Sequence, residues 1–141
     1  RAACEAGAAA LGASSLRDVT VADLARAKDL LDDVTFRRVR HVVTENQRVL
    51  DTVKTLKESG PRSIGKLLYA SHESMRDDFE ITVPPIDALA ALMQDVIGDH
   101  GGARMTGGGF GGAVMALTTP EFTAEAAAQV ATLAAPASAL C

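Results

Sequence analysis

The sequence predicts an α+β fold in which helices pack on a small antiparallel sheet. Up to Ile97, apolar side chains recur at three- and four-residue spacings, as they do in amphipathic helices. After that residue the pattern changes to two short apolar runs on either side of a glycine-rich segment, which is typical of a β-hairpin. A chain of 141 residues suits one compact unit, so we expect a single domain over residues 1–141.

Two short helices are predicted at the start of the chain. Residues 1–11 are rich in alanine and should form a helix that ends at Gly12. Thr20 followed by Asp23 resembles a capping box, in which each residue satisfies a backbone N–H of the other. A second helix should therefore begin there and continue to Leu31.

The strongest periodic signal predicts one long amphipathic helix, which Gly60 and Pro61 end. Its apolar face consists of Phe36, Val39, Val42, Val43, Val49, Leu50, Val53 and Leu56. Asn46 lies on the same face, where a valine or leucine would pack better. A buried amide needs a partner, so we expect Asn46 to form a buried hydrogen bond to a neighbouring element, with ligand contact as the less favoured reading.

Two further helices should follow, over residues 61–75 and 86–97. The segment between them, 79–83, is β-prone but short, and Pro84-Pro85 cannot lie inside a central strand. These residues suit a turn that leads into the later helix, which Gly98 ends.

The last part of the chain should contain the sheet. Residues 103–106 and 113–117 predict two strands, and the loop 107–112 joins them. An alanine-rich helix over residues 121–133 closes the predicted fold.

The glycine loop is the most conspicuous motif, because seven of the twelve glycines lie between Gly101 and Gly112. Its letters match GxGxxG, but a dinucleotide fingerprint needs a helix after the loop, and here a strand follows. No Lys-Ser/Thr pair follows the glycines, so the loop is not a Walker A motif, and the chain lacks the HRD, DFG and VAIK motifs of protein kinases. Two readings remain: a loop whose backbone approaches a ligand or another group closely, and a tight hairpin connection packed beneath another element.

Composition limits the function. A net charge of −4 gives no electrostatic footprint for nucleic-acid binding, and the basic cluster Arg37, Arg38 and Arg40 is expected to be a solvated helix face. No apolar run approaches the roughly 20 residues that cross a bilayer. Cys4 and Cys141 show neither zinc-binding nor disulfide spacing, which favours a reducing cytoplasm.

His72 and Glu73 begin an HExxH zinc motif, but Arg76 stands where the second histidine would be. We therefore expect no metal site here. His72 could serve as a general base by residue type, although a histidine that is either at the surface or hydrogen-bonded is the more favoured interpretation.

Four segments, in the same order along the chain, resemble galactokinases of the GHMP kinase superfamily. The most specific is Arg104–Gly112, which is similar to the superfamily's third motif in its galactokinase form. The others are Leu16–Val19, Arg40–Asn46 and Ser71–Glu80. The resemblance implies a domain of the GHMP kinase C-terminal type and transfer of the ATP γ-phosphate to the C1 hydroxyl of galactose, with Mg²⁺.

The resemblance also implies what this chain lacks. The family's sugar-recognition motif, phosphate loop and catalytic Asp and Arg belong to the N-terminal half, so we expect no catalytic residue in this chain and no activity from it alone. The expected partners of the longer enzyme are galactose, ATP and its own N-terminal domain. The residues expected to line the substrate and nucleotide site are Thr106, Gly107, Gly108, Gly109, Phe110, Gly111 and Gly112.

The chain departs from the family pattern at three places. Ala113 stands where galactokinases usually have Cys, Ile86 stands where they usually have Glu, and Ala131–Cys141 does not resemble their final strand. Two other parent functions stay open: a galactokinase-like sugar sensor without turnover, and a GHMP kinase for another small molecule.

Overall fold

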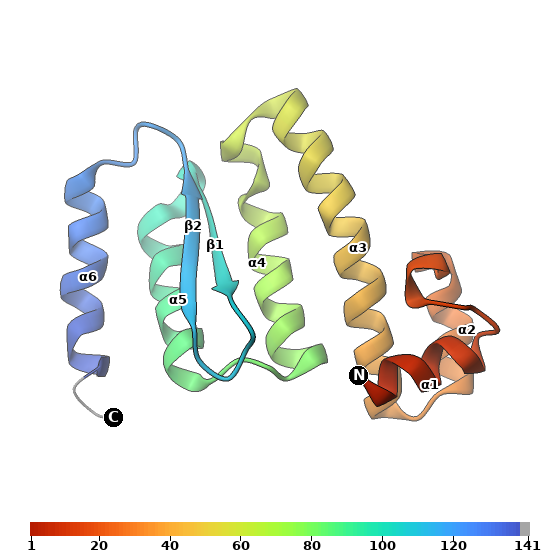
Figure 1. Ribbon diagram of the computed structural model, residues 1–141. Coiled ribbons are helices and arrows are strands. Elements are labelled where there is room, and N and C mark those ends of the chain that lie inside the picture. Colours follow the sequence, from red (N-terminus) through yellow and green to blue (C-terminus); the bar gives the residue numbers. More distant parts are fainter. Residues whose placement is uncertain (139–141) are drawn as a thin grey trace.

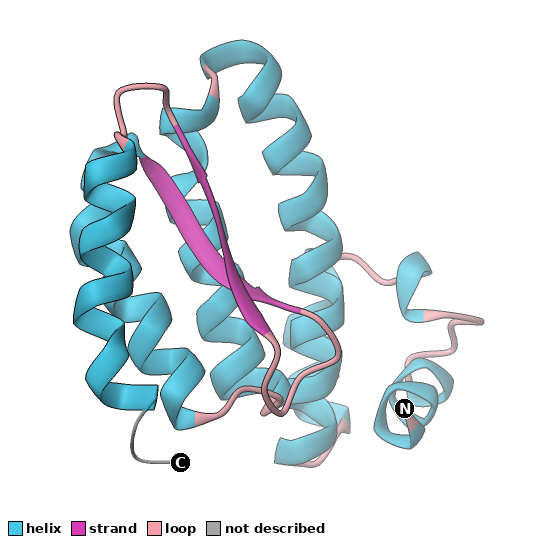
Figure 2. Cartoon of the chain, turned by 60° about the vertical axis from the view of Figure 1, so that its left-hand side comes forward, coloured by secondary structure: helices cyan, strands magenta, loops and turns pink. Residues whose placement is uncertain are grey.

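The computed structural model describes residues 1–138 and confirms the α+β class, with helices arranged around one two-stranded antiparallel sheet (Figure 1, Figure 2). The helices are α1 (Ala2–Ala10), α2 (Leu24–Leu30), α3 (Asp33–Ser59), α4 (Gly65–Ser74), α5 (Pro84–Ile97) and α6 (Ala124–Ser138), and the strands are β1 (Gly101–Thr106) and β2 (Ala113–Thr118). Short 3₁₀ turns are η1 (Leu16–Asp18), η2 (Val21–Asp23), η3 (Pro61–Ile64) and η5 (Gly98–His100), and η4 (Met75–Phe79) is a π-helical turn.

The sheet is a hairpin in which Gly101 lies opposite Thr118 and Thr106 lies opposite Ala113. Helix α4 packs closely along β1, and α5 also packs on the sheet (Figure 1). The approach of α4 requires glycine at its first position, because a Cβ on Gly65 would lie 2.1 Å from the carbonyl oxygen of Gly101. Residue 65 therefore sets the distance between this helix and the strand.

Two groups of buried apolar side chains form the core. The first joins α1, η1 and α2 to the N-terminal half of α3, where Val39 and Val43 are almost completely buried. The second lies between the sheet and the segments before and within α5, and is centred on Met75, Ile86 and Met105. Met105 has no exposed surface, so β1 is buried immediately before the glycine loop begins.

The predicted capping box at Thr20 and Asp23 is confirmed, and the long helix has a cap that was not predicted from the sequence. The Asp23 carboxylate accepts from the Thr20 backbone N–H at 2.9 Å and from its hydroxyl at 2.7 Å. The long helix α3 begins after Asp32, whose carboxylate accepts from the Thr35 N–H at 3.0 Å. It ends at Gly60, as the sequence predicts.

The predicted burial of the long helix is wrong for its second half. Val49, Leu50 and Val53 are 57%, 64% and 48% exposed, because no element within residues 1–138 covers them. Asn46 is exposed as well, so the expected buried hydrogen bond does not form. The side chains of Val49 and Val53 instead line an open groove of about 250 Å³, together with Leu67, Leu68 and Met115 among others.

The last helix is longer than predicted. It begins after Thr123, whose hydroxyl accepts from the Ala126 N–H at 3.2 Å, and it extends to Ser138. Residues 131–138, where the family pattern is lost, are thus helical, and residues 139–141 lie outside the described part of the chain. None of the helices in residues 1–138 combines the length and the hydropathy needed to cross a bilayer.

Candidate functional site

All seven predicted site residues lie in one exposed hairpin connection between β1 and β2 (Figure 2). Thr106 closes β1 and is opposite Ala113, so the five glycines and Phe110 form a projecting loop. Gly109 and Gly111 are half-buried, whereas the other five residues of the set are exposed. The site expected from sequence is therefore a preformed loop with one inner and one outer side.

The inner side of the loop rests on Ile81, which lies in the connection before α5. The Phe110 N–H donates to the Ile81 carbonyl oxygen at 2.6 Å. Gly109 has a φ of +87°, and a Cβ there would lie 2.9 Å from both Cβ and the carbonyl oxygen of Ile81. Only glycine satisfies both the backbone angle and this contact. The loop is thus packed on another segment from within and remains open on its outer side.

Phe110 at the tip of the loop combines two unusual properties. Its φ is +56°, a left-handed conformation that bulky residues seldom adopt. Its side chain is 75% exposed, so packing against other residues within 1–138 does not explain the conformation. The unusual backbone conformation of this exposed residue makes Phe110 a candidate contact residue.

His72 holds the strand that leads into the loop. Its Nδ1 accepts from the Met105 N–H at 3.2 Å, which requires the ring proton to be on Nε2. Nε2 then donates to the Asp87 carboxylate at 3.1 Å, and the other oxygen of that carboxylate accepts from Thr82 at 3.1 Å. His72 is 6% exposed, so of the two favoured alternatives the structure supports the hydrogen-bonded histidine and not the surface one.

The arginine cluster of α3 is not the solvated face that the sequence suggests. The side chains of Arg37 and Arg38 are only 22% and 19% exposed, and both bind the Glu80 carboxylate, at 2.8 and 2.5 Å. Arg37 also donates to the Asp77 carbonyl oxygen at 2.9 Å, and Arg38 donates to that of Asp78. The hydrogen bonds from Arg37 and Arg38 lower the pKa of Glu80. Arg37 and Arg38 are therefore engaged in tertiary contacts with residues about 40 positions later in the sequence, although the sequence pattern places them at the surface.

A second polar cluster joins α3 to η4. Arg40 binds the Asp78 carboxylate, which also accepts from the Ser74 hydroxyl at 3.0 Å. The same hydroxyl lies 3.0 Å from His41 Nδ1, and the His41 ring stacks on Phe79 with centroids 4.5 Å apart. Burial lowers the pKa of His41.

A third cluster joins α3, α4 and β1. The Glu45 carboxylate accepts from Ser71 at 2.5 Å, from Arg104 at 2.7 Å and from Arg48 at 2.7 Å. Burial alone would raise the pKa of Glu45, but the hydrogen bonds from Ser71 and Arg48 and the positive charges of Arg48 and Arg104 outweigh it and lower the pKa. Arg104, the member of this cluster in β1, lies two residues before Thr106. The cluster thus ties β1 to α3 and α4 just before the loop.

Sequence reasoning identified the loop but missed these supports. Glu45 and Arg104 lie in two of the segments that resemble galactokinases, but nothing in the sequence shows that their side chains pair, which only the structure reveals. The segments Arg40–Asn46 and Ser71–Glu80, which the sequence singles out separately, meet through the polar clusters just described. Among residues 1–138, no group of three or more His, Cys, Asp and Glu side chains is placed to hold a metal ion.

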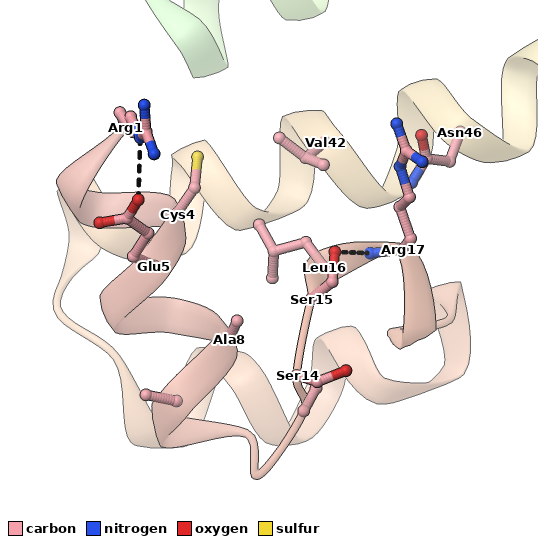
Figure 3. Close-up of a pocket in the computed structure, with 12 residues that line it drawn as sticks. Arg1, Cys4, Glu5, Ala8, Ser14, Ser15, Leu16, Arg17, Val42 and Asn46 are labelled. Atoms are coloured by element: carbon pink, nitrogen blue, oxygen red, sulfur yellow. Dashed lines mark hydrogen bonds and ion pairs between the residues drawn. The ribbon is translucent and has the colours of Figure 1, made fainter.

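A separate groove of about 570 Å³ lies where α1 and the residues after it face α3 (Figure 3). Asn46 lines this groove, and its side chain lies beside Arg17 in Figure 3. The groove shares no residue with the glycine loop. The polar residue on the apolar stripe therefore faces an open surface and not a helix partner.

Comparison with known proteins identifies the family. The family model described as "GHMP kinases C terminal" matches residues 52–135, which is more than half of the chain. The chain belongs to the GHMP kinase family. This GHMP kinase C-terminal domain is 56% identical over 117 residues to a galactokinase from Haemophilus influenzae strain PittEE, covering 81% of the chain. It is 53% identical over 121 residues to a galactokinase from Pasteurella multocida strain Pm70, covering 84% of the chain.

A solved structure agrees with the sequence comparison. The GHMP kinase domain matches the galactokinase of Lactococcus lactis, solved in complex with galactose, with a TM-score of 0.79 and 33% identity over 89% of the chain. The chain spans 30% and 31% of the two galactokinases named above and 32% of the solved one. The GHMP kinase domain thus corresponds to less than a third of each of these relatives.

Proposed function

We propose that this chain is the C-terminal part of a galactokinase, which transfers the ATP γ-phosphate to the C1 hydroxyl of galactose. The observation that supports it most is the preformed, outward-facing glycine loop on a domain whose matched relatives are galactokinases. In this proposal, Thr106 to Gly112 form one wall of the substrate and nucleotide site.

The loop is suited to a phosphate group. Within residues 1–138, Phe110 is the one residue of the loop 107–112 whose N–H donates to another backbone segment, so the other loop N–H groups have no backbone acceptor there. Successive backbone N–H groups in such turns form concavities that bind anions. Since positioning and charge stabilisation dominate phosphoryl transfer, a rigid wall contributes without a catalytic side chain.

We assign no residue of this chain to Mg²⁺, because the described side chains offer no cluster of metal ligands. The ion would be held by the remainder of the longer enzyme. Catalysis likewise needs groups outside this chain, so the chain alone should be inactive. The proposed location of the enzyme is the cytoplasm.

The partner that completes the site is, in this proposal, the enzyme's own N-terminal domain. Two exposed apolar features support it: the Phe110 ring, and the face formed by Val49, Val53 and Met115 beside the sheet. The matched relatives are about three times as long as this chain, so they contain ample polypeptide to cover that face. Burial of apolar surface would then drive the association of the two parts.

The test is galactose-dependent ADP release by a full-length protein that contains this chain. We expect release with galactose and none with mevalonate or homoserine. Release with another small alcohol would point to a different GHMP kinase. A folded protein that binds galactose but releases no ADP would contradict the proposal and indicate a sugar sensor.

A further inference from the structure

We propose that Glu80 is a positioning residue that, clamped by Arg37 and Arg38, fixes the glycine loop for nucleotide binding. This inference rests on the proposed function only for the identity of the nucleotide. The mechanical part, from α3 to the loop tip, depends on contacts within residues 1–138.

The first step is the clamp itself. Each oxygen of the Glu80 carboxylate binds a different arginine of α3: Oε1 lies 2.8 Å from Arg37 and Oε2 lies 2.5 Å from Arg38. The same two arginines bind the carbonyl oxygens of Asp77 and Asp78, the residues before it along the turn. Side chain and backbone of the 77–80 segment are therefore held together against one helix.

The second step is the turn that the clamp stabilises. Glu80 has a φ of 55° and a ψ of 46°, a left-handed conformation that usually belongs to glycine or asparagine at the end of a helix. Both the Glu80 N–H and the Ile81 N–H point back to the Met75 carbonyl oxygen, the second at 3.1 Å. The left-handed backbone conformation is unfavourable for a glutamate. The contacts of its carboxylate with Arg37 and Arg38 therefore offset this cost.

The third step carries the position of the turn to the loop. The turn directs the Ile81 carbonyl oxygen toward the loop, where it accepts from the Phe110 N–H at 2.6 Å. Gly109 is seated on the same residue, close enough that a Cβ would collide with it. A displacement of residue 81 would therefore displace the tip of the loop directly.

At the base of the loop, β1 is held by His72, which accepts from the Met105 N–H, and by the ion pair of Arg104 with Glu45. These contacts hold Arg104 and Met105, and neither involves the loop tip at Gly109 and Phe110. The Glu80 clamp thus holds the loop tip, which the contacts at the base of the loop do not reach. The tip belongs to the segment whose backbone N–H groups are proposed to bind the nucleotide.

Two variants of the full-length protein test the clamp. Glu80→Gly removes the carboxylate but suits the left-handed backbone, so the turn itself is not strained. Glu80→Gln keeps the side-chain length and one acceptor oxygen. Asp33→Asn is the matched control, because Asp33 pairs with the outer side of Arg37 at 3.0 Å without contacting the 77–80 segment.

Hydrogen exchange of the Phe110 amide reports the clamp directly. We expect exchange about tenfold faster in Glu80→Gly, less acceleration in Glu80→Gln, and wild-type exchange in Asp33→Asn. In parallel, calorimetric titration should show the ATP Kd of Glu80→Gly rising about fivefold or more, with the galactose Kd within about twofold of wild type. A merely structural role would weaken both ligands alike.

Unchanged exchange in both Glu80 variants would overturn the clamp. Faster exchange with an unchanged ATP Kd would overturn the positioning role. If the wild-type protein does not bind ATP, the proposed function fails, and the exchange experiment still decides whether the clamp holds the loop.

Discussion

Arg104 in β1 and Glu45 in α3 are 59 residues apart in the sequence, yet their side chains are joined by a 2.7 Å ion pair. Ser71 of α4 completes the contact, since its hydroxyl lies within 2.5 Å of both groups. Three elements are thus tied together beside the strand that enters the glycine loop.

Loss of the Glu45 charge should destabilise the protein. In Glu45→Gln, the partly buried guanidinium groups of Arg48 and Arg104 lose their carboxylate, so we expect the free energy of unfolding to fall by about 1–3 kcal/mol. The change would be measured by urea denaturation at pH 7. Glu58→Gln, at an exposed position of the same helix, should change it by no more than about 0.5 kcal/mol. Equal effects at the two positions would contradict a special role for Glu45.

The stability of the fold should depend on pH through His41. Burial lowers the pKa of this imidazole below 6.5, so the unfolded chain takes up the proton first as the pH falls. The contribution of neutral His41 to the free energy of unfolding is therefore fully present well above pH 6.5 and decreases as the pH falls below it. The stability advantage of wild type over His41→Gln should narrow as the pH falls from 7 toward 5, as followed by denaturant midpoints. A constant gap would show that the pKa of His41 is the same in the folded and the unfolded chain, which would contradict the effect of burial.

Gly65→Ala should destabilise the protein although alanine is the better helix former. The added Cβ would lie 2.1 Å from the Gly101 carbonyl oxygen, so α4 must move away from β1. We expect a loss of about 1–3 kcal/mol, measured by thermal or urea unfolding. Lys66→Ala, at the exposed next position, is the control and should be nearly neutral. A stabilised Gly65→Ala protein would show that the close approach is not required.

Gly109→Val in the full-length enzyme should lower galactose turnover more than it lowers stability. The valine is incompatible with a φ of +87° and collides with Ile81, so the loop tip must be displaced while the buried strands stay paired. We expect kcat/KM to fall by about tenfold or more. Lys66→Ala, at an exposed position outside the loop, is the control and should leave kcat/KM within about twofold of wild type. An unchanged rate for Gly109→Val would make the loop purely structural.

The exposed face of α3 offers a test of the proposed domain contact. Val49→Lys should leave the unfolding of this chain by itself nearly unchanged, because the side chain is 57% exposed. In the full-length protein it should lower the unfolding temperature, since the N-terminal domain is proposed to cover this face. Leu30→Lys, 55% exposed on α2, is the control and should behave alike in both contexts. An unchanged unfolding temperature for Val49→Lys in the full-length protein would contradict the proposal that the N-terminal domain covers this face.

The sequence by itself determined the secondary structure and the loop. Local features are sufficient for these: the Thr20–Asp23 cap, the glycine and proline residues that end α3, and the change from helical spacing to two short apolar runs. Each depends on residues a few positions apart, and the physical preferences involved act over one or two turns of chain.

Only the tertiary structure decided which charges and apolar residues are used. Hydrophobic periodicity identifies a face of α3 but cannot say where its cover ends, so Val39 is buried and Val53 is exposed on one continuous stripe. Likewise, the sequence suggests that Arg38 and Glu80 are surface charges, but the packing of η4 against α3 joins them in an ion pair. Burial and ion pairing depend on elements tens of residues apart meeting in space, and no local pattern in the chain encodes that meeting.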